Sequence, residues 1–228
     1  MSSHVVLFDK VQETRRLLYD LHMELPKWGL VVWTAGNVSE RIHGENLMVI
    51  KPSGVPYDRL TPESMLVCNL DGQPVDGFDN LQLNPSSDTA AHAFVYRNMP
   101  DVGGVVHTHS TFATVFAANR IPIPCVTTMT ADEFGGEIPV GPFAIIGDDS
   151  IGRGIVETLQ DHRSPAVLMA NHGPFTIGKD AKAAVKAAVM CEEVAKVAYF
   201  SQAFGNAVQI DSRTIDKLWT RYQTVYGQ

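Results

Sequence analysis

Two histidines separated by one residue mark the clearest chemistry in the sequence. His107 and His109 end the apolar run "VGGVVHTH", which has the composition of a buried strand. Side chains at positions i and i+2 of a strand share one face, so both imidazoles are expected to face one site while Thr108 points away. His172 ends a second apolar run, "SPAVLMANHGPF", where Gly173 permits a close backbone approach. Three histidines from strand ends, with a carboxylate as fourth ligand, fit zinc or a similar divalent ion in a catalytic site.

The remaining histidines lack such a context. They lie in terminal, helical or loop-like segments, and we interpret them as non-ligands: His4, His22, His43, His92 and His162. His92 differs from the others because it follows Asp88 by four residues on an expected helix. It therefore lies near enough to orient that carboxylate.

The histidines need a frame that brings them together. Apolar residues at helical spacing from Phe8 to Leu25 predict a first helix that ends near Pro26. Short β-like runs bounded by turn residues follow at 29–42, 46–54 and 64–75. Asp71 and Gly72 predict a hairpin turn in the last run, so part of the sheet is expected to be antiparallel.

Further helices are expected in the second half of the frame. A helix that opens at Ser87 or Asp88 leads into the strand of the histidine pair. Residues 180–204 are rich in alanine and contain neither Pro nor Gly, so they predict the longest helix, which ends at Gly205. A final helix is expected at 211–223. The order of elements predicts an α/β/α layered fold around a central mixed, largely antiparallel sheet.

Composition limits the class of protein. The chain has 228 residues with 45% hydrophobic and 19% charged residues, which suits one large domain over residues 1–228. The net charge of −7, with scattered basic residues, disfavours a nucleic-acid partner. Apolar runs are far shorter than the roughly 20 residues that a membrane span needs. Three cysteines without a CxxC pair, in a chain with no signal-peptide pattern, lead us to expect a cytoplasmic protein.

Five motifs resemble the sugar-phosphate epimerases of the class II aldolase/adducin-like family. They are "PSSDTAAH", "GGVVHTHS", "MTADEFGG", "NHGPFTIGK" and the terminal "YGQ", and the matches run in family order from about Thr34 to the last residue. The resemblance implies a class II aldolase-like fold and epimerisation at C4 of L-ribulose 5-phosphate to give D-xylulose 5-phosphate. Because C4 has no adjacent carbonyl, the expected route is retro-aldol cleavage of the C3–C4 bond followed by re-addition.

The resemblance also implies a ligand set for one divalent metal ion per subunit. The family's epimerases use the Asp of "SSD" and the histidines of "HTH" and "HGP", here Asp88, His107, His109 and His172. Zn²⁺ is the expected ion, and Mn²⁺ or Co²⁺ also suits three histidines and one aspartate. Related aldolases generally carry Glu at the position of Asp88. From the residue pattern alone, Asp88 is equally well explained as a helix N-cap.

Three segments correspond to those that hold the substrate phosphate in the family. They are "TAGNVSER", "KPSG" and "PSSD", and they implicate Asn37, Lys51, Ser53, Gly54, Ser86 and Ser87. Small residues expose backbone N–H groups and hydroxyls, and Lys51 adds a positive charge to an acidic protein. Each segment taken alone is also typical of an ordinary turn.

The family's two proton-transfer residues correspond to Asp132, in "TADEF", and Tyr226, in "YGQ". Their expected role is to serve opposite faces of the aldehyde. The resembling epimerases are fourfold-symmetric tetramers with sites between subunits. We therefore expect a homotetramer whose other partner is a small pentulose phosphate.

Two alternatives stay open. The first is a lyase of the same family, a sugar-phosphate aldolase or a decarboxylase. Asp88 in place of Glu, together with Asp132 and Tyr226, favours the epimerase. The second is a non-enzymatic adducin-like interaction domain, which the retention of all three histidines disfavours.

Overall fold

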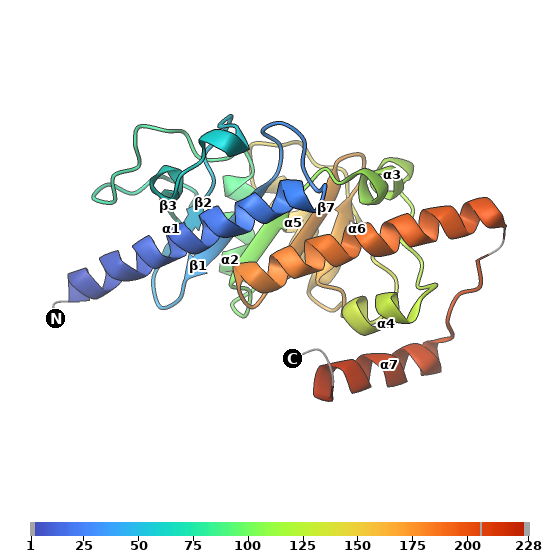
Figure 1. The fold of residues 1–228 in the computed structure, drawn as a ribbon. Coiled ribbons are helices and arrows are strands. Elements are labelled where there is room, and N and C mark those ends of the chain that lie inside the picture. The colour runs from blue at the N-terminus through green and yellow to red at the C-terminus, as the bar shows by residue number, and fades with distance from the viewer. Residues whose placement is uncertain (1–2, 206, 226–228) are drawn as a thin grey trace.

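A mixed sheet forms the centre of the molecule. The computed structural model describes residues 3–205 and 207–225, and within them seven strands run in the order β3-β2-β1-β4-β7-β6-β5 (Figure 1). The strands are β1 Asn37–Ile42, β2 Leu47–Ile50, β3 Leu66–Asn69, β4 Gly104–His107, β5 Val140–Gly141, β6 Ala166–Met169 and β7 Gly173–Gly178. Strands β5 and β6 pair in parallel, and the other neighbouring strands pair antiparallel. The expected mixed, largely antiparallel sheet is confirmed.

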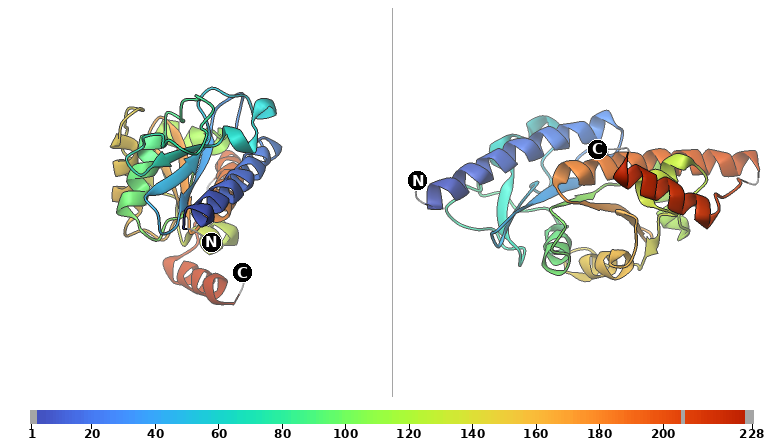
Figure 2. Two further views of the ribbon diagram at one scale, coloured as in Figure 1. Left: turned by 90° about the vertical axis from the view of Figure 1, so that its left-hand side faces the viewer. Right: turned by 90° about the horizontal axis from the view of Figure 1, so that it is seen from below.

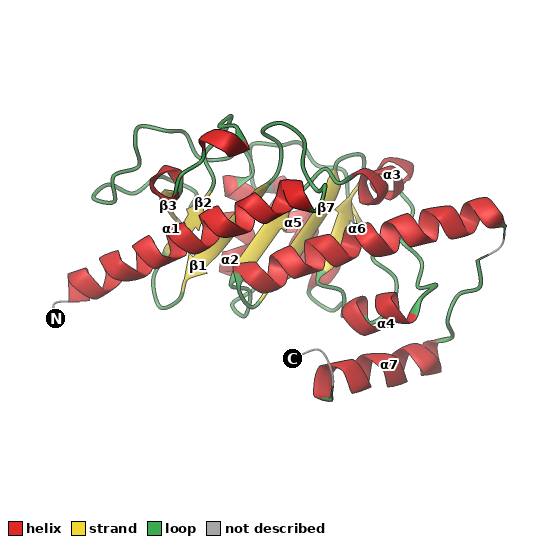
Figure 3. Ribbon diagram, viewed as in Figure 1, coloured by secondary structure: helices red, strands yellow, loops and turns green. Residues whose placement is uncertain are grey.

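Helices cover both faces of this sheet. They are α1 Ser3–Lys27, α2 Thr89–Asn98, α3 Thr111–Asn119, α4 Thr128–Phe134, α5 Ser150–Leu159, α6 Ala181–Phe204 and α7 Ser212–Thr224, with short 3-10 helices η1 Tyr57–Arg59 and η2 Pro62–Ser64. Helices α1 and α6 lie over one face of the sheet, and α2 and α5 lie over the other (Figure 2). Figure 3 shows the sheet between these helices. The α/β/α layering is therefore confirmed.

Alternation along the strands explains the two cores. On β2, Met48 and Ile50 pack with residues of α2 and α5, whereas Val49 packs with α1 and α6. On β4, Val105 packs in the core with α2 and α5, whereas Val106 packs in the core with α1 and α6. Because successive side chains point to opposite faces and both faces are covered, these strands are continuously apolar in sequence.

Local signals set the helix ends where the sequence predicts them. Helix α1 ends at Lys27, one residue after Pro26. The Asp180 carboxylate caps α6 by accepting the Ala183 N–H at 2.7 Å. Gly205, with φ 141°, follows the last residue of α6. The final helix is shifted by one residue from its predicted range.

Some expectations differ from the structure. The strand expected at 29–42 begins only at Asn37, because Trp33 and Gly36 have left-handed φ values of 60° and 80° and turn the chain. Strand β4 ends at His107, so His109 lies just beyond it. The sequence patterns did not predict the helices α3, α4 and α5 or the strands β5 and β7. The turn at Gly72 is present, with a bridge between Cys68 and Pro74.

Two further findings bear on the setting of the protein. All three cysteines are buried and none forms a disulfide. No helix in the described ranges 3–205 and 207–225 has the length and apolar character needed to cross a membrane.

Candidate active site

The three predicted histidines converge. The ring centroids of His107 lie 4.7 Å from His109 and 4.6 Å from His172, and the centroids of His109 and His172 are 5.2 Å apart. One ligand nitrogen from each ring lies within 4.8 Å of the others. Strand β4 provides His107, the segment before α3 provides His109, and the turn between β6 and β7 provides His172. Such a group of imidazoles is a donor set that suits a divalent transition metal.

A backbone carbonyl orients His107. Its Nδ1–H donates to the Pro174 oxygen at 3.0 Å, and its ring stacks on Phe175 with centroids 4.1 Å apart. Because this bond uses Nδ1, the Nε2 lone pair stays available to a metal. Burial, followed by the neighbouring His172 and His109, holds the pKa of His107 well below its ordinary value. The ring is therefore neutral, as a ligand must be.

A close backbone approach brings the two histidine segments together. A Cβ at Gly173 would lie 2.7 Å from the Thr108 oxygen and 3.3 Å from Cδ2 of His109. Only glycine fits this position without displacing backbone, so the expected role of Gly173 is confirmed.

Burial also lowers the pKa of the His172 imidazole from its ordinary value.

Asp88 lines the same cavity as the histidines, outside the group of three whose ligand atoms lie within 4.8 Å of one another, and its side chain does not cap α2. Its residue is 4% exposed, and its Oδ2 accepts a hydrogen bond from Asn37 Nδ2 at 2.7 Å. Its Oδ1 is buried and has no hydrogen-bond partner among the described residues. Although Asp88 directly precedes α2, its side chain makes no cap hydrogen bond within the described chain. A buried carboxylate oxygen without a partner, in the same cavity as three imidazoles, fits a divalent metal ion.

One cavity of 260 Å³ joins the histidines to the predicted phosphate-binding residues. Its lining contains all ten predicted ligand and phosphate residues, Asn37, Lys51, Ser53, Gly54, Ser86, Ser87, Asp88, His107, His109 and His172. Two of the loops hold each other, because the Ser53 N–H donates to Asn84 O at 2.9 Å and the Ser86 N–H donates to Lys51 O at 3.1 Å. Asn37 Nδ2 also donates to Ser86 Oγ at 2.9 Å. The segments predicted separately therefore line one cavity.

Lys51 is the basic side chain of this cavity. The residue is 2% exposed, and its Nζ donates to the carbonyls of Thr34 at 3.1 Å and Pro52 at 3.2 Å. Burial lowers its pKa to about 8. An ammonium group held by two carbonyls keeps a third N–H for an anion.

The cavity also contains residues that the sequence reasoning did not select. Thr34, Ala35 and Gly36 line it, and Ile146 reaches it from the loop before α5. A Cβ at Gly36 would lie 2.5 Å from Val31 Cγ1 and 3.1 Å from the His107 oxygen. The motif "TAGN" contained this signal for Gly36, whereas the sequence contains no comparable signal for Ile146.

Asp132, one of the two predicted proton-transfer residues, does not line this cavity. Asp132 lies on α4 and is not among the described residues that line the cavity. Burial raises the pKa of Asp132, against an opposing effect of Arg221 on α7. Tyr226 lies outside the described residues.

Two of the remaining histidines are buried and serve the frame. His22 Nδ1–H donates to Leu18 O at 2.6 Å, and its Nε2 accepts the Val38 N–H at 2.9 Å. His92 Nδ1 shares a hydrogen bond of 2.8 Å with Ser39 Oγ. Burial lowers the pKa of each histidine to about 3, so both rings are neutral.

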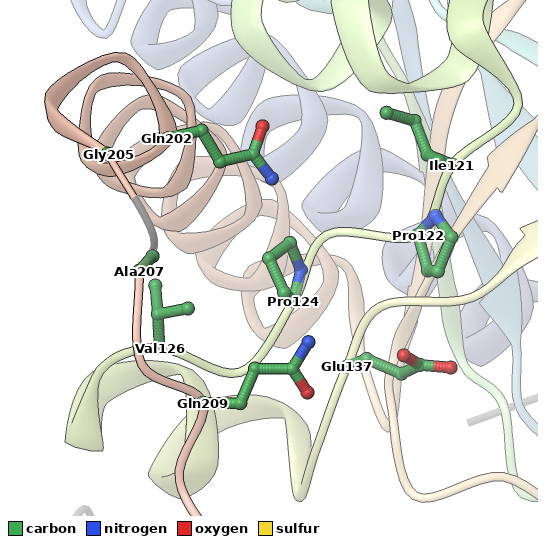
Figure 4. A pocket seen from close by; sticks show the side chains of 9 residues that line it. All are labelled: Ile121, Pro122, Pro124, Val126, Glu137, Gln202, Gly205, Ala207 and Gln209. Carbon is green, nitrogen blue, oxygen red and sulfur yellow. The ribbon is translucent and has the colours of Figure 1, made fainter.

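A second cavity, of 380 Å³, lies near the end of α6 (Figure 4). It is lined by Ile121, Pro122, Pro124, Val126, Glu137, Gln202, Gly205, Ala207 and Gln209. Glu137 is the one charged residue in this described lining. The lining offers no metal-ligand cluster, so we place the chemistry at the histidines.

The chain is similar to known proteins over nearly its whole length. Residues 16–199 match the model of the Class II Aldolase and Adducin N-terminal domain. The chain is 39% identical, over 96% of its length and 100% of theirs, to proteins named L-ribulose-5-phosphate 4-epimerase UlaF from Salmonella paratyphi B and Salmonella choleraesuis.

Solved structures show the same fold. An L-fuculose 1-phosphate aldolase superposes with a TM-score of 0.85 at 25% identity, covering 92% of this chain and 96% of that one. An L-fuculose-1-phosphate aldolase from Thermus thermophilus superposes with a TM-score of 0.71 at 24% identity, covering 89% of this chain and 100% of that one.

Proposed function

The chain belongs to the class II aldolase and adducin family, and from that premise we propose that it is a metal-dependent L-ribulose-5-phosphate 4-epimerase. The reaction interconverts L-ribulose 5-phosphate and D-xylulose 5-phosphate by breaking and remaking the C3–C4 bond. The observation that carries the proposal is the 39% identity to curated epimerases over 96% of the chain. The cavity that joins the histidines to the phosphate residues agrees with it.

We assign the metal site to His107, His109, His172 and Asp88. A divalent ion held there, Zn²⁺ by preference and Mn²⁺ or Co²⁺ as alternatives, supplies Lewis-acid polarisation of the ketose oxygens. Pro174 O holds His107 in the tautomer that presents Nε2. Asn37 holds one oxygen of Asp88 and leaves the other for the metal.

The phosphate end of the cavity has a specific task in this reaction. After C3–C4 cleavage the phosphate is on the two-carbon aldehyde, which must turn over without leaving. Lys51 provides charge, and the loops at Ser53 and Ser86 provide hydroxyl and backbone donors. Retention of this fragment is what separates an epimerase from an aldolase.

Asp132 and Tyr226 are our candidates for proton transfer at the C4 oxygen. One takes the proton from the C4 hydroxyl as the C3–C4 bond breaks and C4 becomes an aldehyde carbon. After the aldehyde has turned, the electron pair of the three-carbon fragment forms the new bond, and the other residue protonates the C4 oxygen on the opposite side.

We propose that the active assembly is a homotetramer of single-domain subunits with sites between them. Asp132 lies on α4, apart from the cavity of its own chain, and this supports a role at a neighbouring subunit's site. The free, buried cysteines support a reducing compartment, the cytoplasm.

A coupled assay on a panel of pentulose 5-phosphates tests the function. Purified protein should convert L-ribulose 5-phosphate to D-xylulose 5-phosphate, lose this activity on chelation, and regain it with Zn²⁺, Mn²⁺ or Co²⁺. A protein that converts no pentulose 5-phosphate but cleaves a ketose 1-phosphate is a lyase, and the proposal is then wrong.

That lyase is the second candidate. The observation in its favour is the TM-score of 0.85 with an L-fuculose 1-phosphate aldolase, which shows that the two chains share a fold. The same arrangement of metal ligands could serve either reaction. Aspartate at position 88, where the related aldolases generally have Glu, favours the epimerase.

A further inference from the structure

Helix α7 is attached to the rest of the molecule in an unusual way. It lies outside the layered body, against α4 (Figure 1). None of its described residues is buried. Ile215, Leu218, Trp219 and Tyr222, at helical spacing, are only half-buried. An apolar stripe of this kind holds a helix nearby but leaves its rotation and register loosely defined, because apolar contact is non-directional.

A polar cluster of three side chains makes directional hydrogen bonds to α7. The Tyr222 hydroxyl donates to Glu133 Oε1, and Lys186 Nζ donates to the same hydroxyl at 2.8 Å. Lys186 Nζ also lies 3.0 Å from Glu133 Oε2. The cluster joins α4, α6 and α7, and the Glu133 side chain is 14% exposed. A hydroxyl that donates to a carboxylate and accepts from an ammonium group is fixed in both distance and direction.

Helix α6 contributes the ammonium group of this cluster. The Lys186 side chain is 50% exposed, so Glu133, at 14%, is the shielded member of the cluster. The other described tether of α7, the pair of Arg163 Nη1 and Asp216 Oδ1 at 2.6 Å, is exposed on both sides. An exposed pair of that kind contributes little.

Both helices held by the cluster lead to the proposed proton-transfer residues. Glu133 follows Asp132 directly on α4, and Tyr222 precedes Tyr226 by four residues along the chain. Arg221, beside Tyr222, places its charge where it affects Asp132. We infer that Lys186, Glu133 and Tyr222 are positioning residues, a latch that sets α4 and α7 in register so that Asp132 and Tyr226 can act on the C4 oxygen. This inference rests on the proposed function.

The test compares metal-loaded wild type with Tyr222→Phe and Lys186→Met. Amide hydrogen exchange of residues 212–224 should be several-fold faster in both variants, because the directional bonds to α7 are lost. The kcat for L-ribulose 5-phosphate should fall about 10-fold, as expected for slightly misplaced groups, whereas KM and metal content should stay unchanged because the cavity is elsewhere.

Two variants serve as controls. Lys186→Arg keeps the charge and the donors and should restore both exchange and kcat. Tyr199→Phe makes the same hydroxyl deletion on α6, away from α7, and should behave as wild type. Wild-type exchange in Tyr222→Phe, or faster exchange with a wild-type kcat, overturns the latch. If the wild type does not epimerise the substrate at all, the proposed function fails, and the exchange comparison still decides whether the latch holds α7.

Discussion

At the scale of single residues, the environment of Asp88 separates two roles that the sequence leaves equal. An N-cap aspartate directs its carboxylate to N–H groups of the first helical turn, whereas Asp88 directs one oxygen to Asn37 and leaves the other open beside the histidines. In the proposed metal site, Asn37 would therefore orient the Asp88 carboxylate. The Pro174 carbonyl has a similar effect on His107. It accepts the Nδ1–H of the ring, so that Nε2 carries the lone pair available to a metal.

Asp88→Asn tests this role. The amide keeps the shape of the side chain and an oxygen that can accept the Asn37 N–H, so the free energy of unfolding should change by less than about 1 kcal/mol. Bound metal, measured by elemental analysis, and activity should both fall severely, as in His107→Ala, because a carboxylate ligand is lost. His162→Ala, whose ring is not in the cluster, should retain its metal. A metal-replete and active Asn variant would show that Asp88 is not a metal ligand.

At the scale of elements, His22 ties α1 to β1 directly beside Asn37. Its folded pKa is about 3 and its ordinary value is 6.5, chiefly because of burial. Between these values the unfolded chain binds a proton that the folded chain does not, so stability is full above 6.5 and falls as the pH falls.

The expected slope is about 1.4 kcal/mol per pH unit for this histidine. His22→Gln removes the titrating group, so urea unfolding between the two pKa values should show a slope that is smaller by about that amount. Equal slopes in the two proteins would mean that His22 titrates normally. His92 is present in both proteins and does not affect the difference.

Gly104 defines the contact of β4 with the start of α6. An added Cβ would lie 2.4 Å from the backbone N and Cα of Ala181, which cannot move without shifting the helix. Gly104→Ala should therefore lower the free energy of unfolding by about 1–3 kcal/mol in urea titration. Gly44→Asn is the control, since Gly44 sits in an open turn at φ 87° that Asn tolerates. An unchanged free energy of unfolding in Gly104→Ala would show that α6 can shift away from β4 at no cost.

At the scale of the whole molecule, the separation of Asp132 from its own chain's cavity leads to a complementation experiment. Asp132→Asn and His107→Ala subunits should each form inactive homotetramers. Random mixing of equal amounts should restore roughly a quarter of the wild-type sites, those in which an intact histidine cluster meets an intact neighbouring Asp132. Light scattering checks that the mixed species are tetramers. Mixtures that stay inactive would place Asp132 and the cluster of one chain at the same site.

The sequence by itself determined the features that depend on near neighbours. The paired His107 and His109, the apolar runs of the covered strands, and the capped helix from Asp180 to Gly205 are local patterns, because periodicity and caps act within one or two turns of chain. The tertiary structure decided what depends on distant partners. The Asn37 bond that turns Asp88 away from its helix crosses 51 residues, and the bond between Glu133 and Tyr222 crosses 89. No local pattern records such contacts, since they form only when the sheet and its helices pack.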